Sequence, residues 1–222
     1  MTRITTVLFD LDGTILDTNE LIIQSFLHAL RGIAPPEFGR EHIIPSMGMP
    51  LEHQLRLFSG REQVEDLIAA YRAFNLREHD AYVKPFPLVG EVLAELRRGG
   101  LRLGVVTTKM RLTTEKGLRF VGIYDDMDAI VTIDDVAHPK PHPEPVETAM
   151  RQLAARPEET LMVGDSVVDI QSAAAAGAVP VGVAWSLKGA NVLREAGARY
   201  VIDDMRELYD LTGLEREPVE KR

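Results

Sequence analysis

From residue 88 to residue 212, short apolar runs alternate with amphipathic stretches, and no other feature of the sequence constrains the fold as strongly. The apolar runs are rich in β-branched residues, and they predict buried strands at residues 103–107, 129–132, 160–163, 179–184 and 200–202. The stretches between them predict helices at residues 88–98, 112–120, 167–176, 188–196 and 204–212, with one more beginning near residue 143. Strands that alternate with helices form a parallel sheet covered by helices on both faces. The predicted fold class is therefore α/β.

One further strand is expected at residues 4–10, and it leads into the sequence Asp10-Leu11-Asp12-Gly13-Thr14. Two carboxylates then lie at the carboxyl end of a parallel strand, where open α/β sheets bind their ligands. Carboxylates this close repel each other, so either one is protonated or a cation holds them together. Gly13 permits a tight turn whose N–H groups can face an anion. An ordinary strand-to-helix turn remains an alternative for this motif alone. A calcium loop is excluded, because its twelfth position is Leu21 and not a glutamate.

Residues 17 to about 82 show only helical patterns. Apolar residues recur at helical spacing in residues 17–30 and 61–79, and two shorter helices are expected within residues 40–58. This segment separates the first strand from the alternating region. We therefore expect a core domain made of residues 1–16 and 83–222, and an inserted all-helical domain of residues 17–82. The insertion is expected to lie over the carboxyl ends of the strands.

Length, charge and composition exclude several classes of protein. The 222 residues suit one core with a small insertion, and they carry a formal net charge of −9. An acidic chain offers no broad surface for nucleic acid, and no apolar run is long enough to cross a bilayer. We therefore expect neither a nucleic-acid partner nor a membrane partner. The N-terminus lacks the shape of a signal peptide, and the absence of cysteine fits a cytoplasmic protein.

Polar side chains collect where the predicted strands end. They are Asp10 and Asp12, then Thr107, Thr108 and Lys109, then Lys140 in the loop after the next strand, then Asp165, Ser166 and Asp169. Because the carboxyl ends of parallel strands meet at one edge of a sheet, these groups can converge. Thr107 alone fits an ordinary strand end and Lys140 alone fits a solvated loop, but the joint pattern favours a site. Carboxylates, lysines and hydroxyls suit Mg²⁺ together with a phosphate group. The six histidines show no ligand spacing, so no zinc site is expected.

Asp10-Leu11-Asp12-Gly13-Thr14, Thr107, Lys140-Pro141 and Gly164-Asp165-Ser166 with Asp169 resemble, in this order, the four motifs of the haloacid dehalogenase superfamily of phosphohydrolases. This resemblance implies a Rossmann-like core and a helical C1 cap, which would correspond to residues 17–82. It also implies a small phosphorylated substrate and a Mg²⁺ ion. The name-giving dehalogenases usually lack the second aspartate of the first motif, so its presence here points to phosphate chemistry. His142 departs from the acidic residue often seen after Lys-Pro in the third motif.

The resemblance also implies a role for each matching residue. Asp10 would attack phosphorus and form an aspartyl-phosphate, and Asp12 would act as general acid and then as general base. Mg²⁺ would be bound by Asp10, Asp165 and the main-chain carbonyl of Asp12. Substrate oxygens would be held by Gly13, Thr14, Thr107 and Lys140. Ser166 and Asp169 would orient Lys140 or the water molecules on the metal.

Segments around residues 18–23, 71–75, 106–109 and 182–189 resemble the PpaX-type pyrophosphatases of the same superfamily. A pyrophosphate substrate would need cations around its second phosphate. The candidates are Lys109, Arg72 from the insertion, Arg111 and Lys188, and the neutral Thr108 beside Lys109 is expected to bind the substrate as well. Phosphoglycolate phosphatases share the four motifs, so hydrolysis of phosphoglycolate is the alternative function. A third alternative is a binding protein that keeps the fold without catalytic turnover. The chain argues against it, because it retains Asp10, Asp12, Lys140 and Asp165. The sequence does not indicate an oligomeric state.

Overall fold

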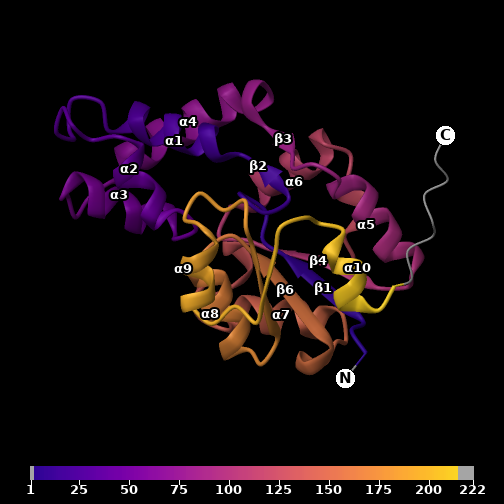
Figure 1. Ribbon diagram of the computed structural model, residues 1–222. Coiled ribbons are helices and arrows are strands. Elements are labelled where there is room, and N and C mark those ends of the chain that lie inside the picture. The colour runs from indigo at the N-terminus through magenta and orange to yellow at the C-terminus, as the bar shows by residue number, and fades with distance from the viewer. Residues whose placement is uncertain (1–2, 215–222) are drawn as a thin grey trace.

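The computed structural model describes residues 3–214. The sequence also predicts a frayed tail at residues 215–222, and this prediction lies outside the described residues. Within them, six strands form one parallel sheet in the order β5-β4-β1-β6-β7-β8 (Figure 1). The strands are β1 (Thr6–Phe9), β4 (Arg102–Val106), β5 (Ala129–Val131), β6 (Thr160–Gly164), β7 (Val179–Val183) and β8 (Tyr200–Ile202). Each lies within a residue or two of its predicted position. The predicted α/β fold class is confirmed.

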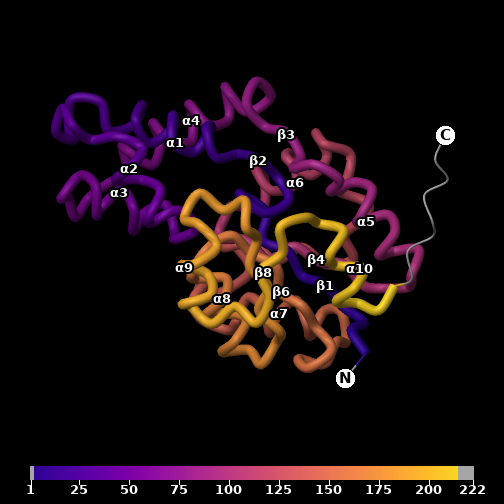
Figure 2. The backbone as a smooth tube through the Cα atoms, in the orientation of Figure 1, coloured from indigo at the N-terminus to yellow at the C-terminus, as the bar shows by residue number. Residues whose placement is uncertain are grey.

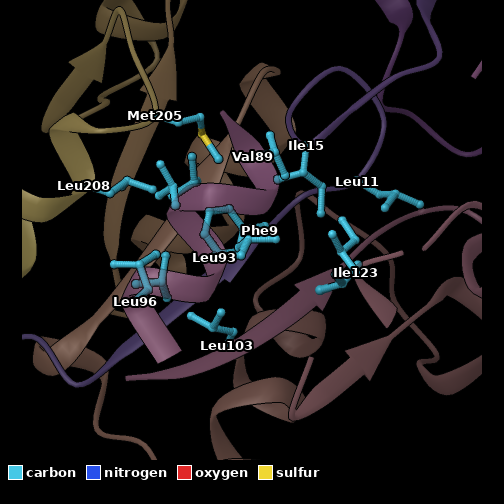
Figure 3. Close-up of a cluster of buried hydrophobic side chains, with 14 of the residues drawn as sticks. Phe9, Leu11, Ile15, Val89, Leu93, Leu96, Leu103, Ile123, Met205 and Leu208 are labelled. Atoms are coloured by element: carbon cyan, nitrogen blue, oxygen red, sulfur yellow. The ribbon is translucent and has the colours of Figure 1, made fainter. Parts of the chain in front are cut away.

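Helices cover both faces of this sheet, because successive side chains of the buried strands point to opposite sides. The helices are α5 (Val89–Arg98), α6 (Arg111–Phe120), α7 (Glu144–Gln152), α8 (Val167–Ala175), α9 (Ala190–Glu195) and α10 (Glu207–Thr212). On one face, Phe9 packs in a cluster with Leu93 of α5 and Leu208 of α10, as Figure 3 shows. On the other face, Leu8 packs in a separate cluster with residues of α7 and α8, including Val146. The apolar runs therefore form a core on both sides of the sheet.

The segment between β1 and β4 begins and ends in a short two-stranded ribbon. β2 (Leu16–Asp17) pairs antiparallel with β3 (Lys84–Pro85), and Lys84 Nζ lies 3.3 Å from a carboxylate oxygen of Asp17. The helix predicted to begin at Asp17 therefore begins two residues later, because Asp17 pairs with the returning chain. The two crossings of the chain lie side by side at this ribbon.

Beyond the ribbon the chain is helical. The helices are α1 (Asn19–Ala29), α2 (Arg40–Ile43), α3 (Leu51–Ser59) and α4 (Glu65–Tyr82), with a 3-10 turn at Ile44–Ser46. They enclose their own apolar cluster, in which the Phe26 ring lies 5.3 Å from Phe58 and 4.8 Å from Tyr71 between centroids. In the backbone trace, α1 to α3 lie to one side of the parallel sheet (Figure 2). Among residues 3–214, no helix combines the length and apolar character needed to cross a membrane.

Candidate active site

The site lies at the carboxyl edge of the three central strands. β1 is hydrogen-bonded to β4 on one side and to β6 on the other, and these strands lead into Asp10, Thr107 and Asp165. The Asp10 N–H donates to the carbonyl of Val163 at 2.8 Å, which continues the ladder to the last residue before the turn. All three side chains are almost completely buried. The sheet order therefore brings together residues that lie far apart in the sequence.

Lys140 connects the loop after β5 to this edge. Its Nζ donates to Asp10 Oδ1 at 2.7 Å, to Asp169 Oδ1 at 2.6 Å and to the Val106 carbonyl at 2.8 Å. The side chain of Lys140 is only 2% exposed, so all three ammonium protons are used inside the protein. Two carboxylate partners hold a buried ammonium group in one position and stabilise its positive charge.

Asp169 is held from both of its oxygens. Its Oδ1 accepts from Lys140, and its Oδ2 accepts from Ser166 Oγ at 2.6 Å and from the Ser166 N–H at 3.0 Å. Ser166 is the N-cap of α8, so this pair is the reciprocal capping arrangement at the start of that helix. Asp169 therefore positions Lys140, and its oxygens are already occupied by protein donors.

Burial raises the pKa of Asp10 well above its usual value, and repulsion from Asp169 and Asp165 adds to this, although Lys140 opposes it. Burial also raises the pKa of Asp165, to about 6. For Lys140, burial lowers the pKa, but the attraction of Asp10 and Asp169 outweighs burial and raises it overall. Lys140 is therefore positively charged at neutral pH. Even so, the site holds more negative charge than one ammonium group balances, so it favours a further cation.

Asp10 and Asp165 fit a divalent cation. One carboxylate oxygen from each of Asp10, Asp165 and Asp169 lies within 4.8 Å of the others. Within residues 3–214, no donor is bonded to the Asp165 carboxylate, and Lys140 occupies only one oxygen of Asp10. A Cβ atom at Gly13 would lie 2.6 Å from Asp165 Oδ2, and the φ of Gly13 is +84°. Glycine is therefore required where the first turn passes the Asp165 carboxylate. Paired, all-oxygen donors of this kind suit Mg²⁺.

Asp12 lies on the side of the site that faces the helical insertion. Its Oδ1 accepts from Lys109 Nζ at 2.8 Å and from Thr18 Oγ at 2.7 Å. Thr18 directly precedes α1, so the chain that enters the insertion also orients Asp12. Sequence reasoning missed Thr18, whose only local signal was its place six residues after Asp12. Lys109 was predicted to face a leaving phosphate, and here it forms an ion pair with Asp12.

A cavity of about 320 Å³ opens above these groups, between the sheet edge and the insertion. Asp10, Asp12, Thr107, Lys109 and Asp165 line its floor and Arg72 of α4 lines its far wall, and all of these were predicted site residues. Arg72 is exposed, and it forms no ion pair with any described residue. Much of the remaining wall is apolar. The apolar lining comes from Ile22, Met47, Met49, Pro50, Leu51, Ile68, Leu76, Met110, Leu112 and Ile133.

Gly13 and Thr14 lie in the turn beneath the cavity and not in its lining. The Gly13 N–H donates to the Leu16 carbonyl at 2.8 Å, and the Thr14 N–H donates to the Leu11 carbonyl at 3.4 Å. Both donors are thus used within the turn. The Thr14 hydroxyl is buried and, among the described residues, has no hydrogen-bond partner.

Two side chains of the core donate hydrogen bonds to one loop of the insertion. Thr108 Oγ donates to the Gly48 carbonyl at 3.1 Å, and Lys188 Nζ donates to the Met47 carbonyl at 2.6 Å. Both lysines that were candidates for the leaving phosphate are thus engaged, Lys109 with Asp12 and Lys188 with this loop. Arg111, the further candidate, pairs with Glu115 and Asp135. Ser186, which donates to the Asp165 carbonyl at 2.6 Å, was not foreseen from the sequence.

Comparison with known proteins agrees with this geometry. The family model of the haloacid dehalogenase-like hydrolases matches residues 7–183. The chain belongs to this family. A protein from Bacillus velezensis named pyrophosphatase PpaX is 45% identical over 214 residues, which cover 96% of this chain and 98% of that protein. A pyrophosphatase PpaX from Bacillus mycoides is 46% identical over 206 residues, 93% of this chain and 95% of that protein. The crystal structure of a hydrolase from Pseudomonas syringae superposes with a TM-score of 0.84 at 26% identity and covers 96% of this chain and 100% of that one.

Proposed function

We propose that this protein is a Mg²⁺-dependent phosphohydrolase that cleaves inorganic pyrophosphate through an aspartyl-phosphate on Asp10. The observation that supports it best is the buried pairing of Asp10 with Lys140, next to the unbonded carboxylate of Asp165. A nucleophilic carboxylate needs a fixed position and a compensating positive charge, because its target is itself negatively charged. Relatives that share about 45% of its residues are named pyrophosphatases, which supports the choice of substrate.

Asp10 would attack phosphorus with a carboxylate oxygen, and Lys140 would hold the carboxylate in position. Asp10 and Asp165 would hold Mg²⁺ together with the main-chain carbonyl of Asp12, and the ion would offset repulsion between the nucleophile and the phosphate. Attack forms a bond between Asp10 and phosphorus and breaks the bond to the leaving oxygen. Thr107 borders the same floor, where its hydroxyl can bind a phosphoryl oxygen.

Asp12 would move the protons. One of its oxygens is occupied by Lys109 and Thr18, and the other has no described donor. In the first step Asp12 gives a proton to the departing oxygen. In the second step it takes a proton from a water molecule that attacks phosphorus and releases Asp10. For pyrophosphate the products are two phosphate ions.

Residues 17–82 are proposed to act as a cap domain. Thr108 and Lys188 of the core bond one loop of this segment, and Arg72 of α4 faces the cavity. A cap that covers the site excludes water and brings groups to the leaving side of the substrate. Arg72 is the exposed cation placed to meet the second phosphate, since Lys109 and Lys188 already have partners.

The apolar wall favours a second candidate substrate. A small organic phosphomonoester, such as phosphoglycolate, presents less charge to the cap than a second phosphate does, and so it needs fewer cations. The many apolar side chains around Arg72 suit such a leaving group better than they suit a bare phosphate. The same Asp10 and Asp12 chemistry would act on both substrates.

Phosphate release from a small panel tests the proposal. Purified protein with Mg²⁺ would be assayed with pyrophosphate, phosphoglycolate and p-nitrophenyl phosphate, and Asp10→Asn would serve as the control. We expect pyrophosphate to give the highest kcat/KM, and activity to be lost with EDTA and inhibited by Ca²⁺, whose looser coordination spoils the geometry. A higher kcat/KM for phosphoglycolate would select the second candidate. Full activity with EDTA would contradict the metal assignment.

A further inference from the structure

The loop that carries Lys140 presents a second group of ligating side chains on its outer side. One ligand atom from each of His138, His142 and Glu144 lies within 4.8 Å of the others. The two histidine rings lie 4.7 Å apart between centroids. All three side chains reach solvent, whereas Lys140, between the two histidines, points into the protein. No zinc site was expected from the sequence, yet the chain here reads His-x-x-x-His-x-Glu.

We propose that His138, His142 and Glu144 form a binding site for a divalent transition-metal ion such as Zn²⁺, separate from the site of Asp10 and Asp165. Two imidazoles and a carboxylate are a common protein ligand set for zinc, and water would complete a tetrahedron. This inference does not depend on the proposed function.

The separations fit such an ion. Ligands bonded at about 2.0–2.2 Å to a tetrahedral zinc ion lie roughly 3.3–3.5 Å from one another. Glu144 Oε2 lies 2.9 Å from His138 Nδ1 and 4.0 Å from His142 Nδ1, which brackets that value. Small side-chain rotations therefore suffice to form the site.

The hydrogen bonds of the three residues are compatible with metal binding. His138 Nδ1 shares a proton with Glu144 Oε2, and a metal ion would take the place of that proton. His142 Nδ1 accepts a weak 3.2 Å bond from the Glu144 N–H, so its lone pair already faces the group. That N–H belongs to the first residue of α7 and has no acceptor within the helix, so a water molecule can replace the imidazole as its acceptor.

The backbone beneath the ligands is already fixed. The His142 carbonyl accepts from Ser172 Oγ of α8 at 2.7 Å, and Lys140 is held by its three buried bonds. Glu144 is held by the N–H groups of Ala137 and His138, each at 2.9 Å. Little conformational entropy is lost on metal binding when the ligands are already held in position. A bound ion would brace the loop from which Lys140 reaches Asp10.

Zinc binding can be measured on the full chain with the Mg²⁺ site disabled. Equilibrium dialysis of the Asp165→Asn protein against Zn²⁺, with Mg²⁺ in excess, should give one zinc ion per chain. Because binding to the folded state alone stabilises it, Zn²⁺ at about a hundred times its Kd should raise the Tm by about 5–10 °C. No bound zinc at micromolar concentrations would overturn the proposal.

Substitutions then locate the ion. In the same background, His138→Ala and His142→Ala should each weaken zinc binding at least about tenfold. His42→Ala is the matched control, because His42 is an exposed histidine beside a glutamate, Glu41, away from this loop. It should leave zinc binding unchanged. Equal binding by the double variant His138→Ala/His142→Ala would overturn the proposal.

A measurement on the unsubstituted chain guards against misfolding of the variants. Diethyl pyrocarbonate modifies accessible histidines, and mass spectrometry of the peptides reports each site. Zn²⁺ should protect His138 and His142 from modification while His42 continues to react. Modification of His138 and His142 at the same rate with and without Zn²⁺ would overturn the proposal.

Discussion

Lys140 joins two buried carboxylates, Asp10 and Asp169, through one ammonium group. Lys140 holds Oδ1 of Asp10, the proposed nucleophile, and the other carboxylate oxygen accepts from no described donor. Its removal would leave Asp10 buried without a described donor and Asp169 with the donors of Ser166 alone, which costs far more than the ion pairs themselves contribute. The position of the nucleophile thus depends on a residue 130 positions away in the chain.

Lys140→Met should therefore lower the free energy of unfolding by about 3–5 kcal/mol in the absence of Mg²⁺. Combining it with Asp10→Asn should restore part of that loss, since the amide removes one of the stranded charges. Urea denaturation of the two single variants and the double variant measures the coupling. Strictly additive effects would show that Lys140 and Asp10 do not interact.

The raised pKa of Asp165 gives Mg²⁺ binding a defined pH dependence. Because the pKa in the folded protein is about 6, above the ordinary value of 3.8, the protonated form stabilises the metal-free fold. That contribution is complete below about pH 4 and is lost as the pH rises through 6. On the proposed assignment Mg²⁺ binds the ionised carboxylates, so its stabilising effect should grow over the same range.

The Tm increase caused by Mg²⁺ should accordingly be larger at pH 7.5 than at pH 4.5, as measured by differential scanning fluorimetry. Asp165→Asn removes the titrating group and is the control, so its Mg²⁺ response should be small at both pH values. An equal Mg²⁺ response of the unsubstituted protein at pH 4.5 and pH 7.5 would exclude Asp165 as a ligand.

One of the places where the core meets the insertion is the loop Met47 to Met49, which accepts hydrogen bonds from Thr108 and Lys188. Thr108 bonds this loop from the core through a neutral hydrogen bond to Gly48. A Cβ atom at Gly48 would lie 2.7 Å from Ser166 Oγ, so the loop also passes close to the start of α8. The loop thus couples the position of the insertion to the strand ends.

Thr108→Val should lower kcat/KM by roughly twofold to tenfold, which corresponds to the about 0.5–1.5 kcal/mol of one neutral hydrogen bond. The Tm should change little, because the bond joins two segments that are each packed on their own core. Thr113→Val is the matched control, since the Thr113 hydroxyl also lies at the cavity but bonds Met110 next to its own helix. A similar loss of kcat/KM in both variants would mean that the contact with Gly48 has no special role.

The strands and helices could be predicted because their signals are local. Short apolar runs such as Val7 to Phe9 predict a buried strand, and the approach of Thr107 and Asp165 to Asp10 follows from the order of parallel strands. The contacts between distant segments could not be predicted. Thr18 reaches Asp12 because the chain turns back on itself before α1, and Lys109 pairs with Asp12 because the loop after β4 lies next to the loop after β1.

On the scale of the whole molecule, the core and the insertion line different parts of the cavity. The sheet edge supplies Asp10, Asp12, Thr107 and Asp165, to which we assign phosphoryl transfer, and the helical insertion supplies Arg72 and most of the apolar wall. The apolar character of that wall could not be predicted either, because its residues come from α1, α3, α4, α6 and the intervening loops. Under the proposed function, we therefore expect the insertion, and not the strand ends, to decide substrate choice.

Arg72→Ala should reduce kcat/KM for pyrophosphate by roughly tenfold to a hundredfold, or about 1.5–3 kcal/mol for a charge-assisted hydrogen bond. The loss for p-nitrophenyl phosphate should be smaller, because its leaving group needs no cation. Arg77→Ala, on the same helix but paired with Glu78, should affect neither substrate. Lys109→Ala should lower both values together, since Lys109 contacts Asp12. Equal losses for both substrates in Arg72→Ala would place Arg72 outside the leaving-group site.

The central claim is that Asp10 becomes phosphorylated during hydrolysis of pyrophosphate. The most direct test is to mix the Asp12→Asn protein with ³²P-labelled pyrophosphate and Mg²⁺, quench in acid and map the label. Phosphate is a good leaving group that can depart without protonation, so loss of Asp12 should slow the second step, which lacks its general base, more than the first, and the intermediate should accumulate. We predict label on the peptide that contains Asp10, released by hydroxylamine, and no label in Asp10→Asn/Asp12→Asn. Label on another residue, or Asp10→Asn turnover within about tenfold of the unsubstituted rate where a loss of 10³-fold or more is expected, would contradict the account.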